Sequence, residues 1–130
     1  MRIQSFVLLF TLGALFASGV AFAGDRPWSV VHADLPLLEA ADMGAVIAGA
    51  ADGATVLAPS RDGGTNIIAS TGRFDFRFGP ASFARHLAGT RGSPVKVVAR
   101  PGTLIEIDTP ADLRMVAELP GGAWLAPFLA

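Results

Sequence analysis

The stretch APSRDGGTNIIASTGRFDFRFGPASFARH, residues 58–86, is the part of the sequence around which the predicted fold is organised. An apolar run at residues 54–57 precedes it and predicts a buried strand. Pro59, Gly63 and Gly64 then disfavour helix and allow tight turns that bring backbone N–H groups together. We therefore expect a strand that leads directly into a glycine-rich loop.

A second loop lies near the end of the same stretch. Gly79 and Pro80 interrupt the chain, and Ser82 is expected to be the N-cap of a helix over residues 82–90. Free N–H groups at a helix N-terminus and in a glycine-rich turn both attract anions. Either loop alone would be ordinary turn chemistry. The two loops together, with the hydroxyl of Thr65 between them, predict an anion site.

The remaining sequence predicts an α/β fold. Continuous apolar and β-branched runs indicate buried strands, and apolar residues at helical spacing indicate a covering helix. Strands are expected at residues 28–32, 55–58, 67–69, 94–99 and 103–107, and helices at residues 37–50, 82–90 and from Thr109 onward. Phe74, Phe76 and Phe78 alternate, which predicts an extended segment whose aromatic face packs in the core or covers the site.

Acidic residues follow or occupy two of the predicted strands. Asp34 comes after the strand at residues 28–32, where ligands gather in α/β sheets, so it is a candidate cation ligand or a helix cap. Glu106 and Asp108 are two positions apart on one predicted strand, so their side chains would share a face. Adjacent carboxylates repel each other unless a cation lies between them. Asp112, in contrast, is expected to cap the last helix.

Composition excludes several classes of protein. The 130 residues suffice for one compact domain. The absence of cysteine excludes disulfides, zinc–thiolate sites and thiol catalysis. A net charge of −1, with scattered Lys and Arg, argues against a nucleic-acid partner.

The apolar N-terminal segment, residues 1–23, supports two interpretations. Arg2, the apolar run at residues 6–16 and the small residues before the end at Ala23 are typical of a secretory signal peptide cleaved after Ala23. The run is too short for a stable membrane span. In the other interpretation, residues 14–23 form an Ala-rich helix of a cytoplasmic protein with a displaced start. We adopt the cytoplasmic interpretation and keep export as the alternative.

Four separated motifs carry a family resemblance: HADLPLL at residues 32–38, APSRDGGTN at 58–66, FRFGPASFARH at 76–86 and LIEIDTPADL at 104–113. From about Val30 to Val116, the chain resembles the C-terminal portion of the 2-phospho-L-lactate or phosphoenolpyruvate guanylyltransferases of coenzyme F-420 biosynthesis. The resemblance implies an α/β fold: a partial three-layer nucleotidyltransferase (glycosyltransferase-A-like) domain with a mostly parallel sheet, whose N-terminal nucleotide-binding part is missing.

The same resemblance implies an activity and a site. The family transfers GMP from GTP to the phosphate of a small phospho-acid and releases pyrophosphate. The implied Mg²⁺ ligands are Asp34, Glu106 and Asp108, and the implied phospho-acid contacts are Thr65, Gly79 and Ser82. No catalytic residue beyond the metal ligands is expected, and His86 is expected to be structural. The family usually has Asp at position 106, so the longer Glu106 would shift the metal.

The expected organisation is an apolar segment at residues 1–23, a guanylyltransferase-like part at 24–119 and a tail at 120–130. A basic, glycine-rich GTP loop should precede HADLPLL, and no GxGxxG or GxxxxGK[ST] motif occurs in the sequence. We therefore expect a truncated enzyme, inactive alone, with GTP and a phospho-acid as partners. The alternatives are an exported or remnant phosphate- and metal-binding module without catalysis, and a gene fragment that does not fold stably. A homodimer is left open.

Overall fold

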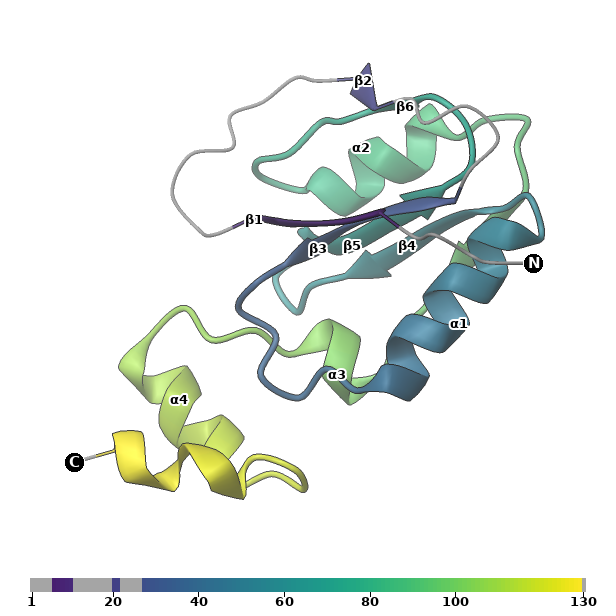
Figure 1. Cartoon of the computed structure of the whole chain (residues 1–130). Coiled ribbons are helices and arrows are strands. Elements are labelled where there is room, and N and C mark those ends of the chain that lie inside the picture. The colour runs from purple at the N-terminus through teal and green to yellow at the C-terminus, as the bar shows by residue number, and fades with distance from the viewer. Residues whose placement is uncertain (1–5, 11–19, 22–26, 130) are drawn as a thin grey trace.

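The computed structural model describes residues 6–10, 20–21 and 27–129 of the chain. One sheet contains, in spatial order, β1 (Phe6–Phe10), β3 (Trp28–His32), β5 (Thr65–Ser70), β4 (Thr55–Pro59) and β7 (Val95–Val97) (Figure 1). Strands β2 (Val20–Ala21) and β6 (Phe74–Asp75) pair separately. The helices are α1 (Ala40–Ala51), α2 (Ser82–Gly89), α3 (Pro101–Leu104), α4 (Pro110–Ala117) and the 3₁₀ helix η1 (Ala123–Phe128).

The sheet is mixed, and one short connection explains why. β5 runs antiparallel to both of its neighbours, β3 and β4, whereas β1 pairs with β3 and β4 pairs with β7 in parallel. The loop at residues 60–64 joins β4 directly to β5. So short a loop can join only antiparallel neighbours, because a parallel pair needs a crossover of about a dozen residues or more. The expectation of a mostly parallel sheet is therefore wrong, while the α/β class is confirmed.

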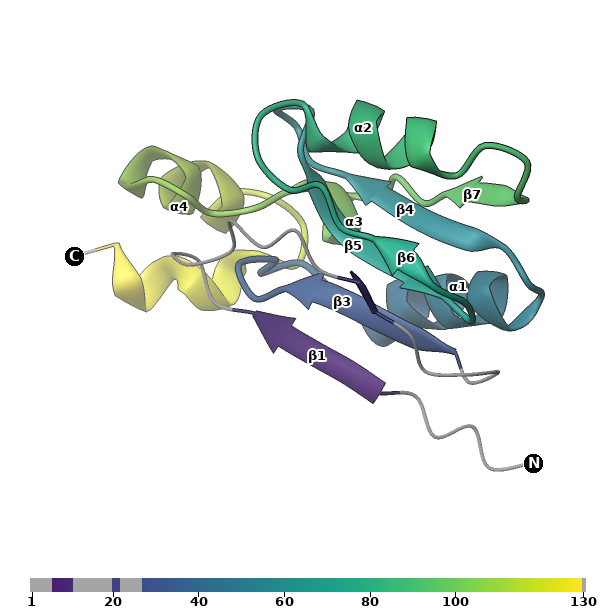
Figure 2. The ribbon, with the colours of Figure 1, turned by 90° about the horizontal axis from the view of Figure 1, so that it is seen from above.

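Helices cover both faces of the sheet, and the sheet separates two apolar layers of the core (Figures 1 and 2). On one face, Val46 of α1 is fully buried in a cluster that includes Ile67 of β5. On the other face, Leu57 and Ile68 are buried in a cluster that includes the partly buried Phe83 of α2. Ile67 and Ile68 enter opposite layers because successive side chains of a strand alternate. The central strand β5 is consequently buried along its whole length.

A third apolar cluster lies among the C-terminal elements and joins them to the loop before α1. Leu37, Val116 of α4 and Leu125 of η1 are its buried members. Gly122 is buried between the two helices, where a Cβ would collide with the carbonyl oxygen of Val116. The predicted tail, residues 120–130, is therefore packed on α4 where it is described, in the form of η1.

Local capping explains where the observed elements differ from the predicted ones. The strand predicted at residues 103–107 is wrong, because α3 occupies Pro101–Leu104 and irregular chain follows it. Pro101 suits the first helical position, and Arg100 N–H donates to Thr103 Oγ1 at 3.0 Å. These capping contacts outweigh the β propensity of the isoleucines, and Ile105 and Ile107 pack into the third cluster instead.

Most of the N-terminal segment, including the proposed cleavage position after Ala23, lies outside the described residues. The Ala-rich helix considered for residues 14–23 is not formed at Val20 and Ala21, which belong to β2, and its other residues are not described. None of the helices in the described ranges is both long and apolar enough to cross a membrane.

Candidate functional site

The glycine-rich loop at residues 60–64 is closed by its own hydrogen bonds. Ser60 N–H donates to Gly64 O at 2.9 Å, and Gly64 N–H donates to Asp62 Oδ1 at 3.1 Å. The Ser60 hydroxyl also donates to Asp62, and this bond, followed by that from Gly64, lowers the pKa of the Asp62 carboxyl. The loop is anchored to α2, since Phe83 N–H donates to Gly63 O at 3.2 Å. The loop thus uses several of its own N–H groups internally and is joined to α2 by a backbone hydrogen bond.

The Thr65 and Ser82 side chains, both predicted to contact substrate, meet where this loop faces α2. Ser82 Oγ lies 3.2 Å from Thr65 Oγ1, and both residues are only 2% exposed. Ser82 is not the N-cap that the sequence predicts. Ala81 takes that position with φ of 54°, so the Ser82 hydroxyl is directed to Thr65 rather than to the helix N-terminus.

His86 completes this buried polar cluster. Its Nδ1 lies 2.9 Å from Thr65 Oγ1, and its Nε2 accepts a hydrogen bond from Arg77 N–H at 2.7 Å. Burial lowers the pKa of His86 to about 4, and the positive charges of Arg85 and Arg77 act in the same direction. The imidazole is therefore neutral near pH 7.

Gly79, the third predicted substrate contact, lies in the turn that leads into this cluster. Its φ is 110°, in the left-handed region that glycine adopts at low cost, and its carbonyl accepts from Ser82 N–H at 3.1 Å. A Cβ at this position would lie 3.1 Å from the Arg85 guanidinium. Gly79 is exposed, whereas Thr65 and Ser82 lie beneath the surface. The structure thus brings all three predicted substrate contacts together.

A second group, of carboxylates, lies where β3 ends. Asp34 Oδ1 is buried and has no hydrogen-bond partner within the described part of the chain. Asp34 O accepts from Ile107 N–H at 3.0 Å, which brings the segment carrying Asp108 alongside. Partial burial raises the pKa of the Asp108 carboxyl, and the negative charges of Asp34, Asp112 and Asp62 raise it further. The negative charge of Asp34 therefore acts on the carboxylate of Asp108.

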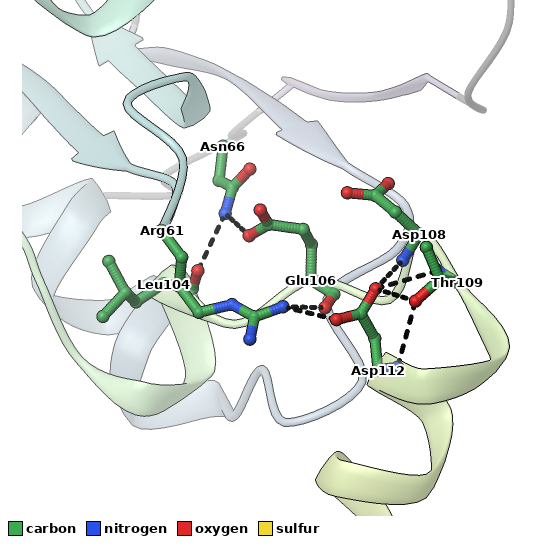
Figure 3. A network of polar contacts seen from close by, with 7 residues as sticks. All are labelled: Arg61, Asn66, Leu104, Glu106, Asp108, Thr109 and Asp112. Atoms are coloured by element: carbon green, nitrogen blue, oxygen red, sulfur yellow. Dashed lines mark hydrogen bonds and ion pairs between the residues drawn. The ribbon is translucent and has the colours of Figure 1, made fainter.

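Glu106 is turned toward a different partner. Its Oε2 accepts from Asn66 Nδ2 at 3.0 Å (Figure 3), and the residue is only 6% exposed. The prediction that Glu106 and Asp108 share a face depended on the strand at residues 103–107, which does not form. Consistently, no three His, Asp or Glu side chains in the described ranges are grouped as a metal site.

Arg61 lies within the glycine-rich motif, and no sequence pattern predicts a role for it. Its Nη2 donates to Glu106 O at 3.2 Å and to Asp112 Oδ1 at 3.0 Å (Figure 3). Asp112 caps α4 as predicted, because its Oδ2 accepts from Thr109 N–H at 2.9 Å and from Thr109 Oγ1 at 2.7 Å. The bond from Thr109 and then that from Arg61 lower the pKa of Asp112 to about 2. Arg61 thus ties the glycine-rich loop to the carboxylate segment.

Comparisons with known proteins agree with the motifs. The family model described as "Guanylyl transferase CofC like" matches residues 17–119. A "phosphoenolpyruvate guanylyltransferase" of Rubrobacter xylanophilus is 38% identical over 101 residues, which are 73% of this chain and 49% of that protein. A protein of the same name from Roseiflexus castenholzii is 38% identical over 112 residues, 83% of this chain and 52% of that protein. The chain thus spans about half the length of these relatives.

Proposed function

The chain belongs to the CofC-like guanylyl transferase family, and from this premise we propose that its site takes part in guanylyl transfer to phosphoenolpyruvate. A phosphate oxygen of the phospho-acid would attack the α-phosphorus of GTP. The bond from that phosphorus to the oxygen that bridges to the β-phosphorus would break, and pyrophosphate would leave. The fold that goes with this proposal is a three-layer nucleotidyltransferase domain of which residues 24–119 form a part.

The observation that carries the proposal is the Asp34 carboxylate. A buried carboxylate oxygen is ordinarily hydrogen-bonded, yet Asp34 Oδ1 has no partner among the described residues and lies near the carboxylate of Asp108. Mg²⁺ is commonly held by one or two carboxylates together with substrate phosphates. Asp34 and Asp108 fit that pattern, whereas Glu106 would first have to leave Asn66. A bound Mg²⁺ would lower the repulsion between the two reacting phosphates.

The proposed phospho-acid site is the cluster around Thr65. The hydroxyls of Thr65 and Ser82 and the exposed turn at Gly79 supply donors of the kind that bind phosphate or carboxylate oxygens. Arg61 would hold this cluster and the carboxylates in fixed relative positions, because it joins the glycine-rich loop next to the cluster to the segment that carries the carboxylates. Preorganised donors of this kind are each worth about 3 kcal/mol to a transition state when removed singly.

The substrate preferred in this proposal is phosphoenolpyruvate, because both relatives carry that name, and 2-phospho-L-lactate is the alternative. The sequence contains no GxGxxG or GxxxxGK[ST] motif, and we therefore expect the 130 residues to bind the phospho-acid but to transfer GMP only when a GTP-binding part is supplied. Cytoplasmic location, and the homodimer left open above, remain predictions.

The test is Mg²⁺-dependent transfer of GMP from labelled GTP to phosphoenolpyruvate or 2-phospho-L-lactate, with binding of each phospho-acid measured in parallel by calorimetry. Asp34→Ala should abolish any transfer, whereas Asp52→Ala should not, because Asp52 is exposed and its carboxylate pairs with Lys96, far from Asp34 in the sequence. Binding without transfer would favour the module that lacks catalysis. If the unaltered chain showed no binding and no transfer, the proposal would be contradicted.

A further inference from the structure

We propose that His86 is a positioning residue that directs a hydroxyl hydrogen of the Thr65–Ser82 pair toward the bound phospho-acid. This inference rests on the proposed function, since it assigns the ligand of the cluster to the phospho-acid. The sequence alone suggested a structural role for His86, and the hydrogen bonds of the cluster give the residue a more specific one.

The first step is the orientation of the imidazole. Arg77 N–H can only donate, so His86 Nε2, at 2.7 Å from it, must present its lone pair. A neutral ring then carries its hydrogen on Nδ1, which lies 2.9 Å from Thr65 Oγ1. The Arg77 backbone therefore selects one tautomer, and the ring donates to the Thr65 oxygen.

The second step is a count of hydrogens. The cluster holds three polar hydrogens, from His86 Nδ1 and the two hydroxyls, but it contains only two internal bonds, His86 to Thr65 and Ser82 to Thr65. Whichever hydroxyl donates in the Thr65–Ser82 bond, one hydroxyl hydrogen is left over. Within the described part of the chain, neither hydroxyl makes a hydrogen bond beyond these. An anionic oxygen of a ligand would satisfy this hydrogen.

The third step is the rigidity of the surroundings. The His86 ring lies between Phe74 and Phe78, with ring centroids 5.5 Å and 5.1 Å away. The charged groups that act on the imidazole are Arg77, Arg85 and Asp75, and the net effect of burial and charge keeps the imidazole neutral. The adjoining turn is strained, because Ala81 has φ of 54°, a left-handed conformation that costs a non-glycine residue free energy and that is enriched at functional sites.

The test uses the full chain and two substitutions that each keep one half of the imidazole's hydrogen bonding. The amide of His86→Asn can still donate to Thr65, whereas the amide of His86→Gln can accept from Arg77 N–H but no longer reaches Thr65 in the same geometry. Affinity for phosphoenolpyruvate should stay near that of the unaltered chain in His86→Asn and fall about tenfold in His86→Gln. Ser93→Ala, at an exposed position outside the cluster, is the control.

Two further measurements keep the outcome independent of folding defects. In chains that keep His86, Thr65→Ser should bind phosphoenolpyruvate normally and Thr65→Val should bind it about tenfold more weakly, because only serine keeps the hydroxyl. The ¹⁵N chemical shifts of the His86 ring should show hydrogen on Nδ1 without ligand. Thermal unfolding of every variant reports whether it is folded.

The outcomes separate the inference from the proposed function. If the unaltered chain binds no phosphoenolpyruvate, the proposed substrate site is wrong and the inference falls with it. If the unaltered chain binds but both His86 variants bind equally well, or both equally poorly while folded, only the inference is overturned. Hydrogen on Nε2 in the ring spectrum would overturn it as well.

Discussion

Asn66 illustrates, at the scale of one residue, how a buried amide decides which carboxylates face the site. Its Nδ2 donates to Thr103 O at 3.1 Å, to Leu104 O at 3.4 Å and to Glu106 Oε2 at 3.0 Å, and the residue is 3% exposed. An amide nitrogen has only two hydrogens, so these three acceptors use both of them. Asp34, in contrast, keeps an oxygen without a partner among the described residues. The proposed cation site therefore uses Asp34, while the carboxylate of Glu106 is bonded to Asn66.

His86 should make the stability of the fold depend on pH. Its pKa is about 4 in the folded chain against 6.5 for the ordinary side chain, so between these values the unfolded chain holds more protons. Stability is therefore complete above about pH 6.5 and declines as the pH falls toward 4. The total loss is on the order of 3 kcal/mol.

Urea unfolding of the unaltered chain and of His86→Asn, at pH values between about 7 and about 4, measures this effect. The raised pKa of Asp108 acts in the opposite direction, because its folded carboxyl holds the proton more tightly than the unfolded one. The difference between the two chains isolates His86, since both keep Asp108. Equal slopes in both chains would show that His86 does not titrate as described.

At the scale of an element, α1 is held against the sheet through a glycine. Gly49 is buried, and a Cβ there would lie 2.7 Å from Val56 Cγ2 and 3.2 Å from Lys96 Cδ. Gly44, in the same helix, is exposed and would place a Cβ in open space. The two glycines therefore differ in role: Gly49 allows close approach to β4, and Gly44 only weakens the helix.

The matched substitutions Gly44→Ala and Gly49→Ala should change stability in opposite directions. Alanine favours a helix interior by roughly 0.5–1 kcal/mol over glycine, so Gly44→Ala should stabilise the fold by about that amount. Gly49→Ala gains the same propensity but forces Val56 to move, which costs about 1–3 kcal/mol in a packed core, so it should destabilise. Free energies of unfolding from urea titration test both, and two stabilising changes would contradict the close packing of α1 on β4.

On the scale of the whole molecule, the candidate site lies where the sheet meets the C-terminal elements. Asp34 follows the end of β3, and its backbone carbonyl accepts a hydrogen bond from Ile107 N–H in the segment between α3 and α4. Arg61 bridges the same junction, since it lies in the loop after β4 and contacts Asp112 at the start of α4. A ligand that binds Asp34 and Asp108 would therefore join the sheet to α4 as well.

Mg²⁺, in the presence of phosphoenolpyruvate, should consequently stabilise the whole fold. At about one hundred times its Kd, a ligand adds about 2.7 kcal/mol to the free energy of unfolding, which a thermal unfolding scan detects as a higher Tm. Asp108→Asn should remove most of this gain. Without the metal, the Asp108→Asn chain should be slightly more stable than the unaltered chain, because the charge repulsion between positions 34 and 108 is relieved. Asp52→Asn is the exposed control, and an equal Mg²⁺ effect in all three chains would argue against the proposed cation site.

Much of the element order could be predicted from local patterns. The strands near residues 28–32, 55–58 and 67–69 and the helix near residues 82–90 follow from apolar runs bounded by Gly and Pro, and the structure confirms them to within a few residues. The strand predicted at residues 103–107 does not form, and the sequence pattern is ambiguous there because its isoleucines suit both a strand and a packed irregular segment. The irregular segment is favoured over a strand only because Ile105 and Ile107 can pack against the third apolar cluster, which is formed by tertiary contacts.

The sequence by itself determined the family, the α/β class and the residue types gathered around the two loops, because these follow from motifs and from local turn chemistry. The tertiary structure alone decided which of those residues meet. Glu106 and Asn66 are bonded although they are 40 positions apart in the sequence, and His86 and Thr65 although they are 21 positions apart. Contacts over such separations are determined by how sheet and helices pack, and no local pattern contains that information. The same packing left one oxygen of Asp34 and one hydroxyl hydrogen of the Thr65–Ser82 pair without partners among the described residues.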